Sequence, residues 1–286
     1  MSKTLATSAV IDFDANVHHV YQGMALLDGS CRSRENVVGE SIKFPVMGKG
    51  IARKRTAPQV KLELMNAAHS RVTCTLEDYN ASDMTDIWDQ AEVNFDEKNE
   101  LAQVIAGGIG RREDQVRIDA LKAAVVAGTV TNSVAATGFG ATNNMNLERT
   151  IEASRLLNVA EVPQTGRHML IHSNGLAAML KITAVTSADY ATFRALMTGE
   201  INTYLGFSWH IMGDRAGEGG LAVAASIRQC WAWHFNAIGF ARGKLDRTMD
   251  ISWLGDYGAW ITSKFIKIGA VVIDGTGCVQ ILADET

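Results

Sequence analysis

The sequence predicts an α+β fold, and three patterns along its 286 residues carry that prediction. Alternating apolar and polar residues, which are typical of half-buried strands, run through residues 40–77 and again from Trp253 onward. One long helical pattern lies between them, over residues 94–126. Short helices and strands are mixed after that helix. The predicted order is therefore an arm, a β excursion, a long helix, a mixed region and terminal strands.

The composition is that of a folded globular protein, with 47% hydrophobic and 20% charged residues. Lys and Arg number 27 against 31 for Asp and Glu, so the net charge of −4 disfavours tight binding of nucleic acid through its phosphates. The four cysteines form no C-x-x-C pair, which argues against zinc or a disulfide framework and fits a reducing compartment. Neither an export signal nor a membrane span is visible.

The first forty residues lack a sustained period and are predicted to form an extended arm, with one helical turn over about residues 17–27. The segments SIKFPV, VKLELM and RVTCTLEDY then alternate in the manner of strands, and GKGIARKRT interrupts them with glycines. Strands joined by such an excursion predict a long β arm.

Charge is segregated along this β arm and the segment after it. Residues 41–73 carry seven bases and one acid, or 7 − 1 = +6, and residues 74–100 carry one base and nine acids, or 1 − 9 = −8. Two interpretations stay open. The blocks form solvated faces of one chain, or they form complementary contacts between copies, because patches of opposite sign steer association and fix register.

The helical pattern over residues 94–126 is the longest in the chain and contains three glycines, Gly107, Gly108 and Gly110. Each glycine costs about 1 kcal/mol relative to alanine inside a helix, so the three weaken it locally and would permit a bend. We expect a strut that can flex.

The mixed region opens with a loop whose Gly138-x-Gly140 lacks the third glycine of a dinucleotide loop, since Asn143 stands there, and no cofactor is predicted. The stretch GEINTYLGFSWHIMG holds a turn and a strand, in which Gly206 allows a backbone conformation or a close approach that a side chain would hinder. The other predicted elements are helices over residues 147–157, 174–180 with Ser173 as N-cap, and 189–197, and strands over residues 168–172, AVAAS, CWAWHFNAIGF, YGAWITSKFIKIGAVVID and CVQILA.

Residues that could carry catalysis or hold a metal do not converge in this sequence. His168 and His172 have the spacing of a helical zinc pair, but HMLIH is predicted to be a strand, in which the two side chains lie about 13 Å apart. No G-x-S-x-G elbow or Walker loop occurs, and the Asp83 and Asp86 carboxylates stand in an acidic run that singles out no acid–base pair. No catalytic, cofactor-binding or metal-binding residue is predicted.

Taken in order, several segments resemble parts of tailed-phage major capsid proteins with the Hong Kong ninety-seven capsid fold. GEINTYLGFSWHIM, after the helical DYATFRALM, is similar to a family segment in which a strand begins at a Gly-aromatic pair. RREDQVRIDALKAA resembles the end of the family's spine helix, and TLEDYNASDMTD resembles the return from its E-loop. CWAWHFNAIGFARG is similar to a strand pair, and AWITSKFIKIGAVVID to the long terminal strand. The resemblance covers nearly the whole chain.

The resemblance implies a major capsid protein, not an enzyme, that self-assembles as hexamers and pentamers into an icosahedral shell enclosing a tailed phage's double-stranded DNA. It implies DNA contact without sequence specificity, scaffolding, portal and decoration or cement proteins as partners, no cofactor and no membrane, and assembly in the host bacterial cytoplasm. Because an arm-like segment begins at Met1, a separate scaffolding protein, or none, is expected. The implied parts are an N-terminal arm (1–38), an E-loop (39–76), a peripheral domain with the spine helix (77–130 and 248–275) and an axial domain (131–247 and 276–286).

On this resemblance the charged blocks are candidate contacts between subunits, with the E-loop docking onto an acidic surface of a neighbour. Two alternatives remain. An encapsulin compartment shares the fold and encloses enzyme cargo, and a soluble α/β enzyme without a recognisable motif belongs to a different class. The candidate contact residues are Arg53, Lys54, Arg55, Lys61, Asp83, Asp86 and Asp89.

Overall fold

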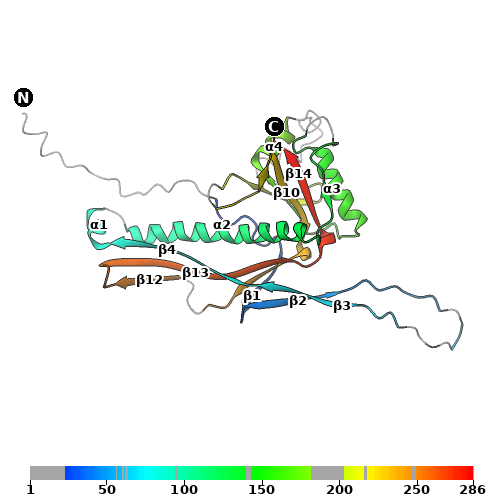
Figure 1. The fold of residues 1–286 in the computed structure, drawn as a ribbon, viewed down its shortest axis with the longest axis horizontal. Coiled ribbons are helices and arrows are strands. Elements are labelled where there is room, and N and C mark those ends of the chain that lie inside the picture. The colour runs from blue at the N-terminus through cyan, green and yellow to red at the C-terminus, as the bar shows by residue number, and fades with distance from the viewer. Residues whose placement is uncertain are drawn as a thin grey trace, which may run out of the picture.

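The computed structural model describes residues 23–55, 57–59, 61, 64–93, 96–139, 143–181, 203–215, 218–245 and 249–285. The molecule is long and thin (Figure 1). Helix α2 (Glu97–Val126) runs along a layer of strands, a more compact layer of strands and helices stands at its C-terminal end, and a hairpin projects beyond the body. The predicted α+β class is confirmed.

Helix α2 has 30 residues and confirms the long helix predicted from the sequence. Glu97 and Glu100 lie in its first turn, where negative charge offsets the positive end of the helix dipole. It ends where Gly128 takes φ +71°, while the N–H groups of Gly128 and Thr129 donate to the carbonyls of Val125 and Ala124. This is the Schellman arrangement, for which glycine is favoured.

A five-stranded sheet lies under α2 and is organised around its longest strand, β13 (Ala259–Val272). One edge of β13 pairs with both β11 (Ile238–Gly243) and β12 (Met249–Leu254), and the other edge pairs with β4 (Glu77–Asp86). Strand β1 (Arg32–Val37) adds to β11 in parallel. The predicted terminal β structure is therefore present, and its long strand carries the sheet.

The predicted β excursion is present as the antiparallel pair β2 (Ser41–Met47) and β3 (His69–Thr75). The strand predicted for VKLELM is wrong, because its described residues, 61, 64 and 65, have no strand structure. A small buried cluster stands at the root of this hairpin, where Phe44, Cys74 and Leu76 pack against Ala241 of β11. Every described residue between positions 48 and 66 is exposed, and the hairpin reaches far beyond the body (Figure 1).

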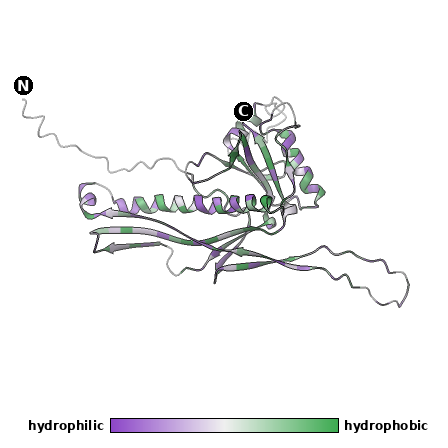
Figure 2. Ribbon diagram, in the orientation of Figure 1, coloured by the Kyte–Doolittle hydropathy of each residue, from purple (hydrophilic) through white to green (hydrophobic). Residues whose placement is uncertain are grey.

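The compact layer is a seven-stranded sheet in the order β5-β14-β10-β6-β8-β7, with β9 paired to β10. Helix α3 (Leu147–Val159) packs on β14, and α4 (Ser173–Leu180) packs on β6. Trp231 and Trp233 are among its largest fully buried side chains, and Figure 2 shows hydrophobic residues concentrated on these strands. The strands are β5 (Ser133–Val134), β6 (Arg167–His172), β7 (Thr203–Tyr204), β8 (Phe207–Met212), β9 (Val223–Ala224), β10 (Ile227–His234) and β14 (Cys278–Asp284).

Three more local predictions are wrong. The N-cap of α4 is His172, whose Nδ1 accepts the Asn174 N–H at 3.2 Å, and Ser173 is the first helical residue. AVAAS is a strand only over Val223–Ala224 (β9), and the next two residues turn with positive φ into β10. CWAWHFNAIGF is not one strand, because the 3-10 turn Phe235–Ala237 splits it; β10 and β11 are the strand pair that the resemblance implies, and they lie in different sheets.

Two predicted helical segments fall wholly or partly outside the described residues. The helix over residues 189–197 lies outside them, as does the first part of the helical turn over residues 17–27. The described part of that turn, residues 23–26, has no helical structure.

Candidate assembly surfaces

The far end of the β2–β3 hairpin, which we call the basic end, carries Arg53, Lys54, Arg55 and Lys61, all exposed. Within this end, the Arg55 Nε donates to the Ala57 carbonyl at 3.0 Å. Large apolar side chains are exposed beside the bases, including Ile51 at 79% and Leu64 at 75%. A two-stranded ribbon that cannot bury its own apolar groups is marginally stable alone, so this end favours contact with another surface.

The candidate acids lie on β4 and on the short helix α1 (Ile87–Glu92), and we call Asp83, Asp86 and Asp89 the acidic tip. Asp83 and Asp89 are exposed, whereas Asp86 is half-buried and caps α1 by accepting the Trp88 N–H at 2.9 Å. Asp86 thus has a structural task that its neighbours lack.

Apolar side chains surround the acidic tip. Trp88 is 77% exposed and Tyr257, in the turn between β12 and β13, is 70% exposed. Trp253 of β12 is partly exposed and packs edge-on against Trp260 with ring centroids 5.4 Å apart. A patch that combines aromatic rings with acids is suited to a basic, partly apolar partner.

The structure places the basic end and the acidic tip at opposite ends of the molecule (Figure 1). The hairpin projects past the C-terminal end of α2, while α1 lies beside the N-terminal end of that helix. The charged blocks that are adjacent in the sequence therefore do not meet within one chain. Contact between them requires a second copy.

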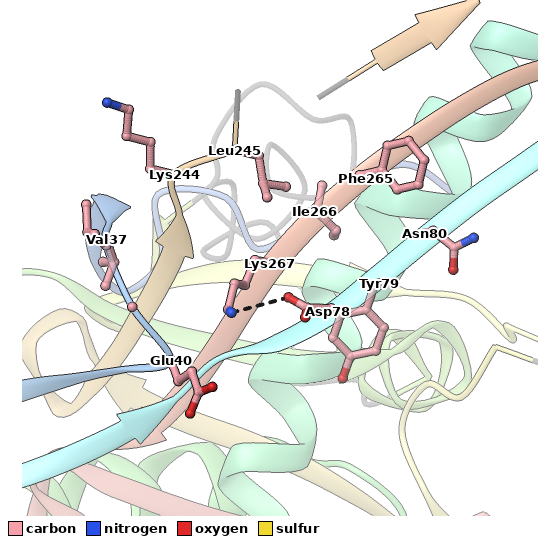
Figure 3. Close-up of a pocket in the computed structure, with 12 residues that line it drawn as sticks. Val37, Glu40, Asp78, Tyr79, Asn80, Lys244, Leu245, Phe265, Ile266 and Lys267 are labelled. Atoms are coloured by element: carbon pink, nitrogen blue, oxygen red, sulfur yellow. Dashed lines mark ion pairs between the residues drawn. The ribbon is translucent and has the colours of Figure 1, made fainter. Parts of the chain in front are cut away.

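A groove of about 890 Å³ opens beside the hairpin root, on the face of the sheet turned away from α2 (Figure 3). Phe265 and Lys267 of β13 point into it, because the alternate residues Ile266 and Ile268 face the helix. Lys267 forms an ion pair with Asp78 at 3.6 Å. Its described lining combines apolar side chains with lysines and carboxylates, so the groove offers a mixed apolar and charged contact surface.

The candidate glycines of α2 lie in an unbroken stretch of helix. Gly107, Gly108 and Gly110 are all helical, and no break divides α2 there. A Cβ on Gly110 would lie 3.0 Å from the backbone nitrogen of Ala25. That glycine lets the segment before β1 approach the helix closely.

Gly206 lies in the two-residue turn that joins β7 to β8. Leu205 and Gly206 have φ of +51° and +78°, and Tyr204 pairs with Phe207 across the turn. Positive φ at both central residues is the type I′ geometry that suits the twist of a hairpin. Apart from its chain neighbours, no described residue has an atom within 4 Å of a Cβ built on Gly206, so the backbone angle of this glycine is the constraint.

The histidines of the compact layer pack inside the protein. His168 of β6 and His210 of β8 approach with Nδ1 and Nε2 3.1 Å apart, and both rings stack with Trp233. Burial, with the nearby His210 and His234, lowers the pKa of His168 to about 4, so the pair is neutral at neutral pH. Across the described residues, no group of three or more His, Cys, Asp or Glu side chains is arranged to hold a metal ion.

The four cysteine thiols are buried and free. Burial raises the pKa of Cys74 to about 11 and that of Cys230 to about 12, which keeps these thiols protonated and unreactive. Within the described residues, no helix combines the length and hydrophobicity that crossing a bilayer requires.

Sequence reasoning missed a group of charged residues where α2 crosses the compact layer. Asp114 and Arg117 are almost fully buried, and Arg111 and Arg215 bind the chain before β1. In the sequence RREDQVRI these charges look like the solvated face of a helix. The sequence does contain one signal for this group: charged residues are dense on a stretch of helix whose apolar spacing also requires buried positions.

The subunit is elongated, with a projecting hairpin, exposed apolar and charged ends and a long helix over a sheet. The model of the family described as "Phage capsid protein" matches residues 5–285, and the chain belongs to that family. No curated protein sequence matched it.

Solved phage structures share its fold. The chain is similar to one from Mycobacterium phage Ogopogo, with TM-score 0.71, 11% identity and 99% of each chain covered. It is similar to the capsid of Ralstonia phage GP4, with TM-score 0.70, 9% identity and coverage of 97% of this chain and 95% of that one. It is also similar to a chain from Mycobacterium phage Che8, with TM-score 0.68, 13% identity and coverage of 96% and 97%.

The protein is thus a major capsid protein, a structural subunit of a multi-subunit shell, located in the virion capsid. Membership in this family confirms that the chain is not an enzyme, because capsid proteins are structural. Neither the encapsulin nor the soluble-enzyme alternative gains support from the family match.

Proposed function

We propose that this chain self-assembles as hexamers and pentamers into an icosahedral shell that encloses the double-stranded DNA of a tailed phage. Membership in the capsid family supports assembly into a shell. The proposed mechanism of assembly rests on one structural observation. The β2–β3 hairpin projects from the body with basic and apolar side chains exposed, and none of its described residues beyond the root cluster is buried. Such an extension gains stability when a neighbour covers it.

The neighbour's surface that fits the basic end is the acidic tip. The two carry opposite charge, both expose large apolar side chains, and they lie at opposite ends of one chain. An exposed ion pair contributes about 0.2–1 kcal/mol, so several pairs mainly set register. Burial of side chains such as Ile51, Leu64 and Trp88 supplies the larger share, at roughly 25 cal/mol per Å² of apolar area.

The parts of the subunit have separate tasks in this proposal. An arm (1–38) and an E-loop (39–76) reach neighbours, a peripheral domain (77–130 and 248–275) carries the spine helix, and an axial domain (131–247 and 276–286) packs around the centre of each ring. Strand β11 lies within the axial range by sequence but pairs with β13 and β1 under α2. It therefore ties the two domains together. A bend at Gly107, Gly108 and Gly110 would let the peripheral domain adapt to different positions in the shell.

The remaining partners follow from a DNA-filled shell. DNA contacts the inner surface without sequence specificity, which agrees with a net charge of −4 and no strongly basic character overall. Scaffolding, portal and decoration or cement proteins join during assembly in the host bacterial cytoplasm, and neither a cofactor nor a membrane takes part.

Negative-stain electron microscopy tests this function directly. The purified chain is expressed alone and, in parallel, together with the other head proteins of its source phage. We expect closed, regular shells in at least one preparation. If only the co-expressed chain forms shells, a scaffold is required, whereas abundant shells from the chain alone remove that requirement. Small soluble particles in both preparations would contradict the proposed function.

A further inference from the structure

The chain before β1 is held in place by side chains and not by strand pairing. Residues 23–31, which we call the arm root, form neither helix nor strand before β1 begins at Arg32. They lie against the middle of α2, where Ala25 contacts Gly110. A segment without regular structure must satisfy its backbone polar groups elsewhere if it is to be fixed.

Asp114 of α2 binds the arm root at its centre. Its Oδ2 accepts the Leu26 N–H at 2.8 Å, and its Oδ1 accepts the Leu27 N–H at 3.0 Å. The side chain is fully buried, and Arg215 and Arg117 donate to the same two oxygens at 2.9 and 3.4 Å. A buried carboxylate with four donors is stable only while all of them stay in position.

Two arginines bind the arm root on the side nearer the N-terminus. Arg111 of α2 donates to the Gly23 carbonyl at 3.1 Å, and Arg215 donates to the Met24 carbonyl at 3.1 Å. Arg215 therefore contacts Asp114 and the arm root at the same time.

The compact layer binds the other side of the arm root. The Trp233 indole N–H of β10 donates to the Ser30 carbonyl at 2.9 Å, and the His210 ring of β8 hydrogen-bonds the Leu26 backbone. Side chains from α2 and from the seven-stranded sheet thus hold one stretch of backbone between them.

The loop after β8, residues 213–215 and 218–220, docks on the same part of α2. Glu218 forms an ion pair with Arg111, and the Gly220 N–H donates to the Gln115 Oε1 at 2.6 Å. Gln115 fills the space where Gly219 has no side chain. The helix, the loop and the arm root therefore share one joint, and Asp114 lies at its centre.

We propose that Asp114 is a positioning residue that fixes the arm root on α2 and couples its position to the docking of residues 213–215 and 218–220 on the same helix. Two chain segments besides α2 itself, the arm root and the loop that carries Arg215, donate to its two oxygens, so moving either of them breaks a bond to a buried charge. The position of the arm root, and with it any contact that the arm makes with a neighbouring subunit, would then depend on how the compact layer packs on α2. A carboxylate that only stabilises the fold would not couple these two positions.

Amide hydrogen exchange on the unassembled subunit tests the proposal without requiring shells. Asp114→Asn keeps the size of the side chain and removes its charge. We expect exchange at Leu26 and Leu27 to accelerate at least tenfold, and exchange at Gly220 to accelerate with it although Gly220 bonds to Gln115 and not to Asp114. Exchange at the core amide of Trp231 is expected to change less than twofold.

Glu97→Gln is the matched control, because Glu97 is an acid of the same helix but lies in its first turn, far from Asp114. It is expected to leave the amides of Leu26, Leu27, Gly220 and Trp231 unchanged. Uniform acceleration that includes Trp231 would show a general loss of stability and overturn the positioning role. Acceleration at Leu26 and Leu27 without Gly220 would overturn the coupling.

A second variant covers the case in which Asp114→Asn does not fold. Arg215→Gln removes one donor from Asp114 and from the Met24 carbonyl but leaves the Leu26 and Leu27 bonds in place. The proposal expects faster exchange at both Leu26 and Gly220. Unchanged exchange at Leu26 would contradict it, whether or not the protein forms shells.

Discussion

Reversing charge at the basic end should raise the concentration at which shells form. The variant Arg53→Glu with Arg55→Glu changes the four bases of that end from +4 to 0. Each reversed residue loses an exposed attraction of about 0.2–1 kcal/mol and adds a repulsion of similar size. Two residues therefore weaken each contact by about 2 kcal/mol, which corresponds to an assembly threshold about thirtyfold higher for one such contact per subunit.

Salt dependence separates this effect from a folding defect. The screening length falls from about 30 Å at 0.01 M salt to about 3 Å at 1 M, so the threshold of the variant should approach that of the wild type as salt rises. Light scattering against protein concentration, at several salt concentrations, measures the threshold. Lys43→Glu with Arg71→Glu is the matched control, because these exposed bases make the same charge change near the hairpin root.

A compensating variant identifies the partner surface. Asp83→Lys with Asp89→Lys should restore the low-salt threshold when combined with the reversed hairpin, and should raise the threshold when introduced alone. Asp86 is left unchanged, because loss of its cap on α1 would cost about 1 kcal/mol of stability by itself. A wild-type threshold for the reversed hairpin at low salt, or no restoration in the combined variant, would refute the pairing.

The remaining predictions concern the stability of the unassembled subunit. Gly206→Ala should destabilise it by about 1 kcal/mol, or about 2–3 °C in Tm, because alanine disfavours φ +78°. The control Gly213→Ala should change the stability by no more than about 0.5 kcal/mol. Equal effects of the two variants would show that the turn at Gly206 has no special role. His168 has a folded-state pKa of about 4, below the ordinary histidine value of 6.5. As the pH falls between these two values the unfolded chain binds a proton that the folded chain does not, so stability falls through that window. After allowance for partial exposure, the wild type should lose about 1–2 kcal/mol of unfolding free energy between pH 7 and 4. His168→Gln should lose less unfolding free energy over the same range, as measured by urea unfolding. Parallel pH profiles of the two proteins would contradict the lowered pKa of His168.

Patterns set by neighbouring residues were predictable from the sequence. The apolar spacing of α2, the alternation of β2, β3 and β13 and the glycine of the turn at Gly206 all show in short windows, and the structure contains each element. The end of α2 at Gly128 also follows a local rule, since glycine is the residue that adopts φ +71° readily.

Features that depend on distant or atypical partners were not predictable. The turn after β9 uses Ala225 and Ser226 at positive φ, where a glycine would have signalled it. His172 caps α4 although histidine is not among the favoured N-cap residues. The split of β10 and β11 between two sheets depends on strands more than 25 residues away, which no local pattern contains.

The candidate contact residues show the same limit. Their opposite charges were evident from the sequence, but only the fold shows that they lie at opposite ends of the molecule. The role of Asp114 was hidden, because a charged residue on a helix is normally exposed and its partners come from positions 88 residues before and 101 residues after it.

The cluster at the hairpin root has a geometric consequence for the whole particle. A contact between two different ends of identical chains is head-to-tail, and it closes into a ring only when the rotation between successive copies divides a full turn; otherwise it grows into an open filament. That rotation depends on the angle at which β2 and β3 leave the body, which Phe44, Cys74, Leu76 and Ala241 hold in place. A core of four side chains would therefore act on the number of subunits in a ring, although none of the four touches a neighbour through the basic end.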